Sequence, residues 1–245
     1  MLVALGVAQA QQYRSGQGVN FYSRDKGIAL GQRLAQEFRQ ATTPLDGAAV
    51  NDYVRRVGAN LAAQLPGGWT FTFETVREHQ GGATDEPVAL PGGPIFVPAD
   101  LFVTAQTEAE FAGMLAHAMA HVVARHYTRQ ATKEDLGAIH TASLSFSTPG
   151  TASPAGLLAY RRGMESEADY LAIQTMAAAG YDPAGLAAYL ERVQPAPGRN
   201  DATSALPPRN RRLASIRTEI QNLPAGDYHS SGEFDRVQAD VKRLR

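Results

Sequence analysis

A strongly signalled helix in the middle of the chain limits the folds open to this sequence more than any other feature. Thr107 is followed three residues later by Glu110, a reciprocal capping pattern, and an apolar-periodic stretch then runs from Phe111 to Tyr127. His117 and His121 lie four residues apart within that stretch, so both imidazoles project from one face of the helix, one turn apart. The two imidazoles can therefore chelate one ion.

Other segments show the same helical spacing of apolar residues. We expect further helices at Asn20 to about Thr42, Val50 to Gln64, Ala155 to Ala179, about Pro183 to Val193, Arg209 to Leu223 and Glu233 to Leu244. Gly137 to Pro154 lacks strong periodicity, which indicates a mobile connection or a weak helix.

Two segments before the central helix have the character of β-strands. Trp69 to Val76 alternates apolar and polar residues and is rich in β-forming types, which indicates a half-buried strand. The second segment, Pro87 to Val97, is interrupted by the run Pro91-Gly92-Gly93-Pro94. Because proline cannot donate to a β-ladder, we expect this second segment at a sheet edge.

The composition excludes several classes of function. The chain has 23 basic and 24 acidic side chains, a formal net charge of -1, so no overall field attracts nucleic acid or an anionic membrane. It has no cysteine, which excludes disulfides, thiol catalysis and thiolate metal sites, and any metal must use His, Asp or Glu. No segment reaches the roughly 18 apolar residues of a membrane span. We expect no nucleic-acid partner and no stable membrane span.

The start of the chain resembles an export signal. Residues 1–10, MLVALGVAQA, are apolar and end in Ala8-Gln9-Ala10, the small-x-small pattern that precedes signal-peptidase cleavage, although a basic leading region is missing. We interpret residues 1–10 as a signal-peptide remnant rather than a core helix. Residues 11–245 are then expected to form a single domain that is periplasmic or secreted.

Two carboxylates repeat the four-residue spacing on a later helix. Glu165 can supply a third ligand oxygen, and Asp169 can accept a hydrogen bond from a liganding histidine. Two neutral nitrogens and a carboxylate with an open fourth position describe a catalytic zinc site. Spacing alone leaves two interpretations open, because a histidine pair at this spacing is more often a surface or core pair than a metal site.

Three sequence blocks, in this order, resemble a family of zinc peptidases. They are Ala89 to Val97 (ALPGGPIFV), Glu108 to His126 (EAEFAGMLAHAMAHVVARH), and Glu165 to Asp169 (ESEAD) followed by Ala179 to Pro183 (AGYDP). Over roughly Val19 to Ile216 the chain is similar to the gluzincin family that includes the CAAX prenyl proteases, the HtpX heat-shock proteases and related periplasmic peptidases. The resemblance implies an α+β, mainly helical, zincin-like fold in which a small mixed or antiparallel sheet covers the motif helix.

The resemblance also implies a role for each matching residue. By this resemblance, His117, His121 and Glu165 are expected to bind zinc, and Asp169 is expected to support these ligands without contacting the metal. The edge strand aligns an extended peptide or an unfolded protein by β-augmentation. The substrate-binding residues implied by this alignment are Ala89, Leu90, Pro91, Gly92 and Gly93.

The chain departs from the family pattern at its most reactive position. The family motif is HExxH, and its glutamate takes a proton from the zinc-bound water and passes it to the leaving amine. Here the motif reads HAMAH, with Ala118 at the position of the base. A methyl group cannot move a proton, and loss of a positioned general base typically lowers the rate by about 10² to 10⁴-fold.

Two further positions differ from the family, which favours a naturally altered site over an engineered alanine. Glu86-Pro87 stands where the family usually has an asparagine at the start of the edge-strand motif. Leu206-Pro207 stands where the family commonly has a histidine before proline.

Three functions stay open on this evidence. One is an exported zinc endopeptidase with impaired chemistry, for which Glu86 is a candidate substitute base because the family's edge strand passes the active site. Another is a non-catalytic peptide-binding or regulatory protein of the cell envelope that keeps the zinc site. The third is a helical protein whose histidines bind nothing.

Two residues near the motifs are expected to be structural. His126 comes five residues after His121, so we expect it to face away from the metal and to act as a structural hydrogen-bonding group. Glu167 lies between Glu165 and Asp169 on another face of the helix, where solvent or a salt bridge is expected.

Overall fold

The computed structural model describes residues 18–79, 86–142, 155–196, 198 and 204–244, and excludes the side chains of 78–79, 135–142 and 155–158. The interpreted signal remnant, residues 1–10, lies outside this described part. None of the helices in the described part is both long and apolar enough to cross a membrane.

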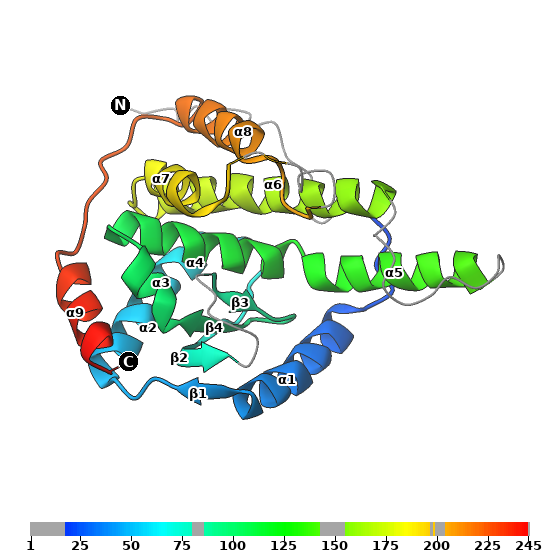
Figure 1. Cartoon of the computed structure of the whole chain (residues 1–245), viewed down its shortest axis with the longest axis horizontal. Helices are drawn as coiled ribbons and strands as arrows, with labels where there is room; N and C mark the ends of the chain where they lie inside the picture. The colour runs from blue at the N-terminus through cyan, green and yellow to red at the C-terminus, as the bar shows by residue number, and fades with distance from the viewer. Residues whose placement is uncertain (1–17, 80–85, 143–154, 197, 199–203, 245) are drawn as a thin grey trace, which may run out of the picture.

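The described part is mainly helical with one small sheet, as expected. Its elements are α1 (Arg24–Gln40), β1 (Thr42–Pro44), α2 (Ala48–Ala62), β2 (Thr72–His79), β3 (Val88–Ala89), β4 (Pro94–Pro98), α3 (Ala99–Thr104), α4 (Glu108–Val123), α5 (His126–Ala142), α6 (Ala155–Ala178), α7 (Ala184–Val193), α8 (Arg209–Gln221) and α9 (Phe234–Leu244). Helix α4 runs through the centre, with α6, α7 and α8 on one side and the sheet on the other (Figure 1).

Helix α4 forms the core of the fold because it is apolar on almost every face. Residues 111–120 are all buried, as expected of a helix that is hydrophobic all round. At its start the Thr107 hydroxyl accepts from the Glu110 N–H at 3.2 Å. The Glu110 carboxylate reaches back one residue further than a capping box requires, to the Gln106 N–H at 2.8 Å. The capped helix predicted from this segment is confirmed, but it ends at Val123 instead of continuing to Tyr127, because Arg125 adopts a left-handed conformation with φ of 57°.

The sheet is mixed and has the strand order β1-β2-β4-β3. Strand β2 pairs antiparallel with β1 and parallel with β4, and β3 pairs antiparallel with β4. The expectation that the whole Pro87 to Val97 segment lies at a sheet edge is wrong, because only β3 does. Strand β4 is an interior strand, and it tolerates Pro94 and Pro98 because they occupy its first and last positions, where a missing N–H leaves the ladder intact.

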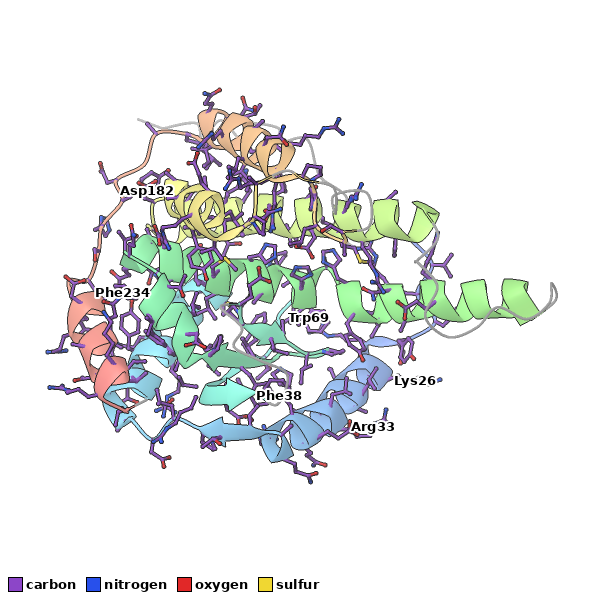
Figure 2. All side chains as sticks on the ribbon, in the orientation of Figure 1. Lys26, Arg33, Phe38, Trp69, Asp182 and Phe234 are labelled. Atoms are coloured by element: carbon purple, nitrogen blue, oxygen red, sulfur yellow. The ribbon has the colours of Figure 1, made fainter. Side chains whose placement is uncertain are left out.

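Helix α1 packs against the sheet and against the turn between β3 and β4. Figure 2 shows Phe38 on the sheet side of α1, whereas Lys26 and Arg33 point away, and the rings of Phe38 and Phe96 have centroids 4.4 Å apart. The backbone of α1 touches the turn directly at Gly31, where an added Cβ would lie 1.6 Å from the Pro91 carbonyl oxygen. No side chain fits at position 31.

Candidate metal centre

Two helices bring the predicted ligands together. His117 and His121 come from α4 and Glu165 from α6, which packs alongside α4 (Figure 1). The two histidine Nε2 atoms lie 3.0 Å apart. The Glu165 carboxylate oxygens lie 3.5 Å from His117 Nε2 and 3.7 Å from His121 Nε2. Two imidazole nitrogens and one carboxylate therefore converge on one point.

The spacing of these donor atoms fits a divalent ion. Ligand atoms bonded at about 2.0 to 2.1 Å to a tetrahedral zinc lie about 3.3 to 3.4 Å from one another, and the three observed separations lie on both sides of this value. Within the described part of the chain, this is the one group of three or more such side chains close enough to hold a metal ion. The donor set, two nitrogens and one carboxylate oxygen, leaves a fourth position open.

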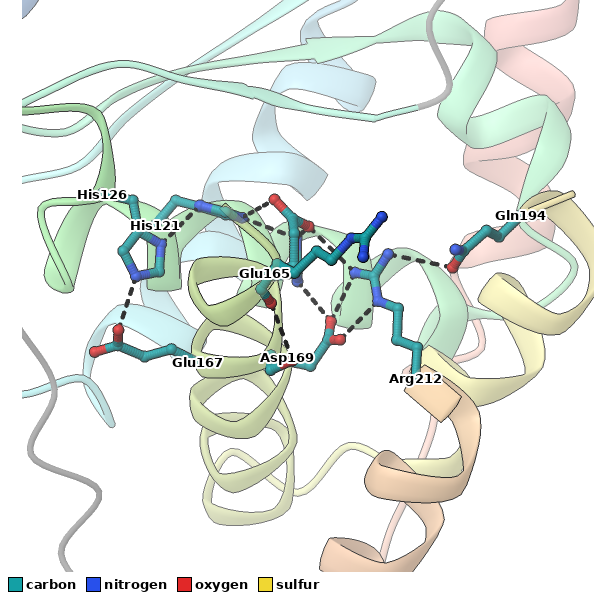
Figure 3. A network of polar contacts seen from close by, with 10 residues as sticks. His121, His126, Glu165, Glu167, Asp169, Gln194 and Arg212 are labelled. Atoms are coloured by element: carbon teal, nitrogen blue, oxygen red, sulfur yellow. Dashed lines mark hydrogen bonds and ion pairs between the residues drawn. The ribbon is translucent and has the colours of Figure 1, made fainter. Parts of the chain in front are cut away.

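Asp169 lies behind His117, as its spacing predicted, and is itself clamped by an arginine. Its Oδ1 atom lies 2.9 Å from His117 Nδ1. Arg212 on α8 donates to both Asp169 oxygens, from Nε at 2.6 Å and from Nη2 at 2.8 Å, and its Nη2 lies 3.5 Å from Glu165 (Figure 3). Asp169 and Arg212 are only 3% and 4% exposed. The buried ion pair of Asp169 and Arg212 thus holds His117, a candidate ligand, in place.

The sequence analysis missed Arg212, although the sequence carries a signal for it. Arg212 lies on α8 four residues before Ile216 and next to Leu213, and all three are buried. An arginine on the apolar face of a helix needs a buried acidic partner. The α8 sequence could therefore have predicted a buried ion pair, but not with which carboxylate.

The pKa values of the four site residues show which of them are charged near neutral pH. Burial opposes charge on His117, but the Asp169 and Glu165 carboxylates outweigh burial and raise the pKa of His117 to about 9. Burial and the neighbouring His117 lower the pKa of His121 to about 3. Burial also opposes ionisation of both carboxylates, yet the pKa of Glu165, which contacts His117, and that of Asp169, which pairs with Arg212, fall to about 2. Near neutral pH the site therefore contains two ionised carboxylates, Glu165 and Asp169, a neutral His121, and a protonated His117 whose ligand proton a metal would displace.

His126 and Glu167 form a second buried group beside the site. His126 Nδ1 lies 2.9 Å from His121 Nδ1, and His126 Nε2 lies 3.1 Å from Glu167 Oε2 (Figure 3). Arg129 also donates to Glu167, at 3.1 Å. The hydrogen-bonding role expected for His126 agrees with these contacts. The expectation that it faces away from the metal side is wrong, because a new helix begins at His126 and its ring lies against His121. Of the two environments considered for Glu167, the structure has the salt bridge and not solvent, since Glu167 is only 6% exposed.

A cleft of about 310 Å³ opens over the three ligands. Of the residues expected to bind substrate, Ala89, Leu90, Pro91 and Gly92 line this cleft, whereas Gly93 is not among its lining residues. Gly92 and Gly93 have φ angles of 86° and 122°, a left-handed conformation that favours glycine and turns the chain from β3 into β4. One wall of the cleft is therefore formed by the β3–β4 hairpin.

The departures from the zinc-peptidase pattern also lie at or near the cleft. Ala118 lines it beside His117 and is buried, and Glu86 lines it from an exposed position. Leu206 is half-buried and does not line the cleft, although its neighbour Ala205 does. Trp69 and Arg24 form another part of the lining that the sequence analysis did not predict, with the guanidinium carbon 4.3 Å from the centroid of the indole ring.

A mainly helical α+β domain, in which a buried HxxxH helix and a carboxylate from a second helix converge in a cleft, defines a metallopeptidase fold. The comparison with known families agrees. The model of peptidase family M48 matches residues 46–220, and the chain belongs to this family.

Named relatives are bacterial and mitochondrial proteases. The chain is 26% identical over 189 residues to the β-barrel assembly-enhancing protease of Yersinia pestis, covering 70% of this chain and 38% of the relative. It is 25% identical over 236 residues to the protein of that name in Escherichia coli K12, covering 86% and 47%. The mitochondrial metalloendopeptidase OMA1 of Schizosaccharomyces pombe is 32% identical over 123 residues, covering 47% and 36%. The chain thus spans less than half the length of each.

Proposed function

We propose that this chain is a zinc-binding member of the metallopeptidase family whose peptide hydrolysis is impaired or absent, because Ala118 replaces the general base. One observation supports this most: Ala118 lines the cleft next to His117, while His117, His121 and Glu165 keep a geometry that suits the ion. The metal ligands are retained and the proton-transfer group beside them is replaced by a methyl group.

Each residue of the site has its own role in the proposed function. When bound, zinc would supply Lewis acidity, which lowers the pKa of coordinated water and polarises a peptide carbonyl. His117, His121 and Glu165 would hold the ion, and Asp169 with Arg212 would fix the orientation of His117. Ala118 can neither take up nor deliver a proton. Glu86 is a carboxylate in the same cleft, which keeps it as a candidate substitute base.

A second function, peptide binding without turnover, is favoured by the cleft itself. The cleft remains open beside β3, and β3 is an edge strand of the sheet. An edge strand can pair with an extended peptide or an unfolded segment through backbone hydrogen bonds. The names of the Yersinia and Escherichia relatives refer to β-barrel assembly, which supports our proposal of a periplasmic or secreted envelope protein acting on or holding other proteins.

The decisive experiment restores the missing base. Casein hydrolysis by the purified parent chain, with and without chelator, is compared with that of Ala118→Glu. Because a positioned base contributes about 10² to 10⁴-fold in rate, we expect Ala118→Glu to gain chelator-sensitive activity of that order. Ala118→Gln is the matched control, since it has the same shape and cannot accept the proton.

The outcomes of this comparison separate the candidate functions. Fast, chelator-sensitive turnover by the parent, equal to that of Ala118→Glu, contradicts the impaired-base proposal and also rules out a purely binding role. Slow turnover by the parent that is unchanged in Glu86→Gln removes Glu86 as a substitute base. Saturable binding of a labelled casein peptide without turnover is the result expected for the binding function.

A further inference from the structure

The position of the hydrogen on His121 matters for the metal site and can be derived from the contacts. A neutral imidazole carries its hydrogen on one ring nitrogen and has a lone pair on the other. His121 Nε2 faces the ligand cluster, 3.0 Å from His117 Nε2, and its Nδ1 faces His126 Nδ1 at 2.9 Å. Only a His121 with its hydrogen on Nδ1 presents a lone pair to a metal.

The Glu167 carboxylate determines, through His126, which ring nitrogen of His121 carries the hydrogen. The far nitrogen of His126, Nε2, lies 3.1 Å from Glu167 Oε2, and an ionised carboxylate only accepts hydrogen bonds. The hydrogen of a neutral His126 is therefore on Nε2, which leaves its Nδ1 as an acceptor. The facing Nδ1 of His121 must then be the donor. His126 and Glu167 are 3% and 6% exposed, so competition from bulk water for these contacts is weak.

The fold builds this arrangement through a break between α4 and α5. In one continuous helix, residue 126 would lie about 140° around the axis from residue 121. Arg125 instead adopts a left-handed conformation, with φ of 57°, and α5 begins anew at His126. Arg129 then donates both to Glu167 and to the Ala124 carbonyl, which connects the break to the carboxylate. The two rings meet although they come from different helices.

From these contacts we infer that His126 is a positioning residue which, with Glu167, holds His121 in the tautomer that has its hydrogen on Nδ1 and so presents Nε2 to the metal. This inference rests on the proposed zinc site. In this arrangement His121 is supported as His117 is supported by Asp169. The difference is that the His126 imidazole lies between His121 and its carboxylate, Glu167.

Zinc affinity, measured by competition with a chromophoric chelator, tests the inference on the full chain. Loss of such a supporting partner typically lowers metal affinity by about 10 to 100-fold, and we expect this for His126→Phe. His126→Gln should recover part of the loss, because its amide can accept from His121 and donate to Glu167. Unchanged zinc affinity in His126→Phe would overturn the inference.

A matched pair of variants separates positioning from mere bracing of α5 against α6. Glu167→Gln removes the charged partner of His126, whereas Glu134→Gln removes another ion pair between the same helices, to Arg161 at 2.7 Å, that does not touch the histidines. We expect a several-fold loss of zinc affinity in the first variant and none in the second. Equal losses would show that His126 and Glu167 only hold the helices together.

Nitrogen-15 spectra of the histidines in the metal-free chain read the tautomer directly. We expect His121 to carry its hydrogen on Nδ1 in the parent, and to populate both tautomers in His126→Phe. A parent His121 with its hydrogen on Nε2 contradicts the inference whatever the zinc affinity. If the parent binds no zinc but shows the expected tautomer, the zinc site is refuted, whereas the positioning of His121 by His126 and Glu167 is supported.

Discussion

At the scale of single residues, the most consequential contact is the buried pair of Arg212 and Asp169. Removing two charges from water is unfavourable, so this pair adds little net stability compared with two apolar side chains. Breaking it is different, because one charge is then left buried without its partner. Asp169 Oδ1 also lies 2.9 Å from Nδ1 of His117, a candidate metal ligand, so the same break would disturb His117.

We predict that Arg212→Met lowers the free energy of unfolding by about 3 to 5 kcal/mol, the usual effect of leaving a buried charge unpaired. Urea titration measures this change. Arg217→Met is the matched control on the same helix, because Arg217 pairs with Glu191 at the surface, where both side chains are more than half exposed. An exposed pair contributes about 0 to 1 kcal/mol. Equal effects of the two substitutions would contradict the assignment of a buried ion pair.

The ligand residues could be predicted from the sequence because they form a motif, whereas their partners form none. Helix spacing singles out the pair His117 and His121 and the pair Glu165 and Asp169, and the family resemblance assigns each of these residues its proposed role. The contact of His126 with His121 depends on the left-handed Arg125, and no glycine or proline marks that break in the sequence. Arg212 and Asp169 are 43 residues apart in sequence and come into contact only in the tertiary fold.

At the scale of elements, the start of α4 is anchored by a buried carboxylate. Glu108 accepts hydrogen bonds from the Tyr53 hydroxyl at 3.0 Å, from the Ser230 hydroxyl at 2.7 Å, and from the backbone and hydroxyl of Ser231 at 2.5 and 2.6 Å. Burial opposes ionisation, but these hydrogen bonds outweigh it and lower the pKa of Glu108. The carboxylate thereby ties the segment before α9 to the ligand-bearing helix.

We predict that Glu108→Gln destabilises the chain by about 1 to 3 kcal/mol at about pH 7, because a buried hydrogen-bonded group loses its charge. A carboxyl with a lowered folded pKa contributes stability that is complete above its unfolded pKa and is lost as pH falls through the folded value. Since the unfolded pKa is near 4.5, the difference between parent and variant should shrink below about pH 4.5. Urea titrations at about pH 7 and pH 3.5 measure it.

Glu191→Gln serves as the control for Glu108→Gln, since Glu191 is exposed and pairs only at the surface with Arg217. We expect it to change stability by less than about 1 kcal/mol at either pH. A difference between Glu108→Gln and the parent that persists unchanged in acid would show that the charge of Glu108 is not what stabilises the start of α4.

Most of the long helices could be predicted from apolar periodicity and capping, within a few residues at each end. Helix α5 was missed, because the central helix was expected to continue to Tyr127 and Gly137 to Pro154 to be a mobile connection or a weak helix. Periodicity cannot reveal the strand β1, with three residues, or the helix α3, with six residues, because each completes less than two periods of its own pattern, about 2 residues for a strand and about 3.6 for a helix. The interior position of β4 was missed for a different reason. Its two prolines indicated an edge, and only the pairing register shows that they occupy the two ends of the strand.

At the scale of the whole molecule, the candidate metal site joins two helices that are distant in sequence. His117 and His121 lie on α4 and Glu165 on α6, and residues 143–154 between α5 and α6 lie outside the described part. An ion bound by both helices stabilises the folded chain by mass action, since the unfolded chain has no assembled site.

We predict that a chelator lowers the unfolding temperature of the zinc-loaded chain. At free zinc one hundred times the dissociation constant, binding contributes about 2.7 kcal/mol to the free energy of unfolding. Calorimetry with and without chelator measures the shift, and His121→Ala should show almost none. A parent that melts at the same temperature in both conditions would contradict the metal site.

The direct contact of Gly31 with Pro91 bears on how this protein should be divided for study. The family model begins at residue 46, after α1 has ended. A fragment cut at that boundary would keep the ligands and the hairpin but lose the helix that backs the hairpin. The family model alone therefore defines the structural unit too narrowly, because the turn that lines the cleft packs against α1, which lies outside residues 46–220.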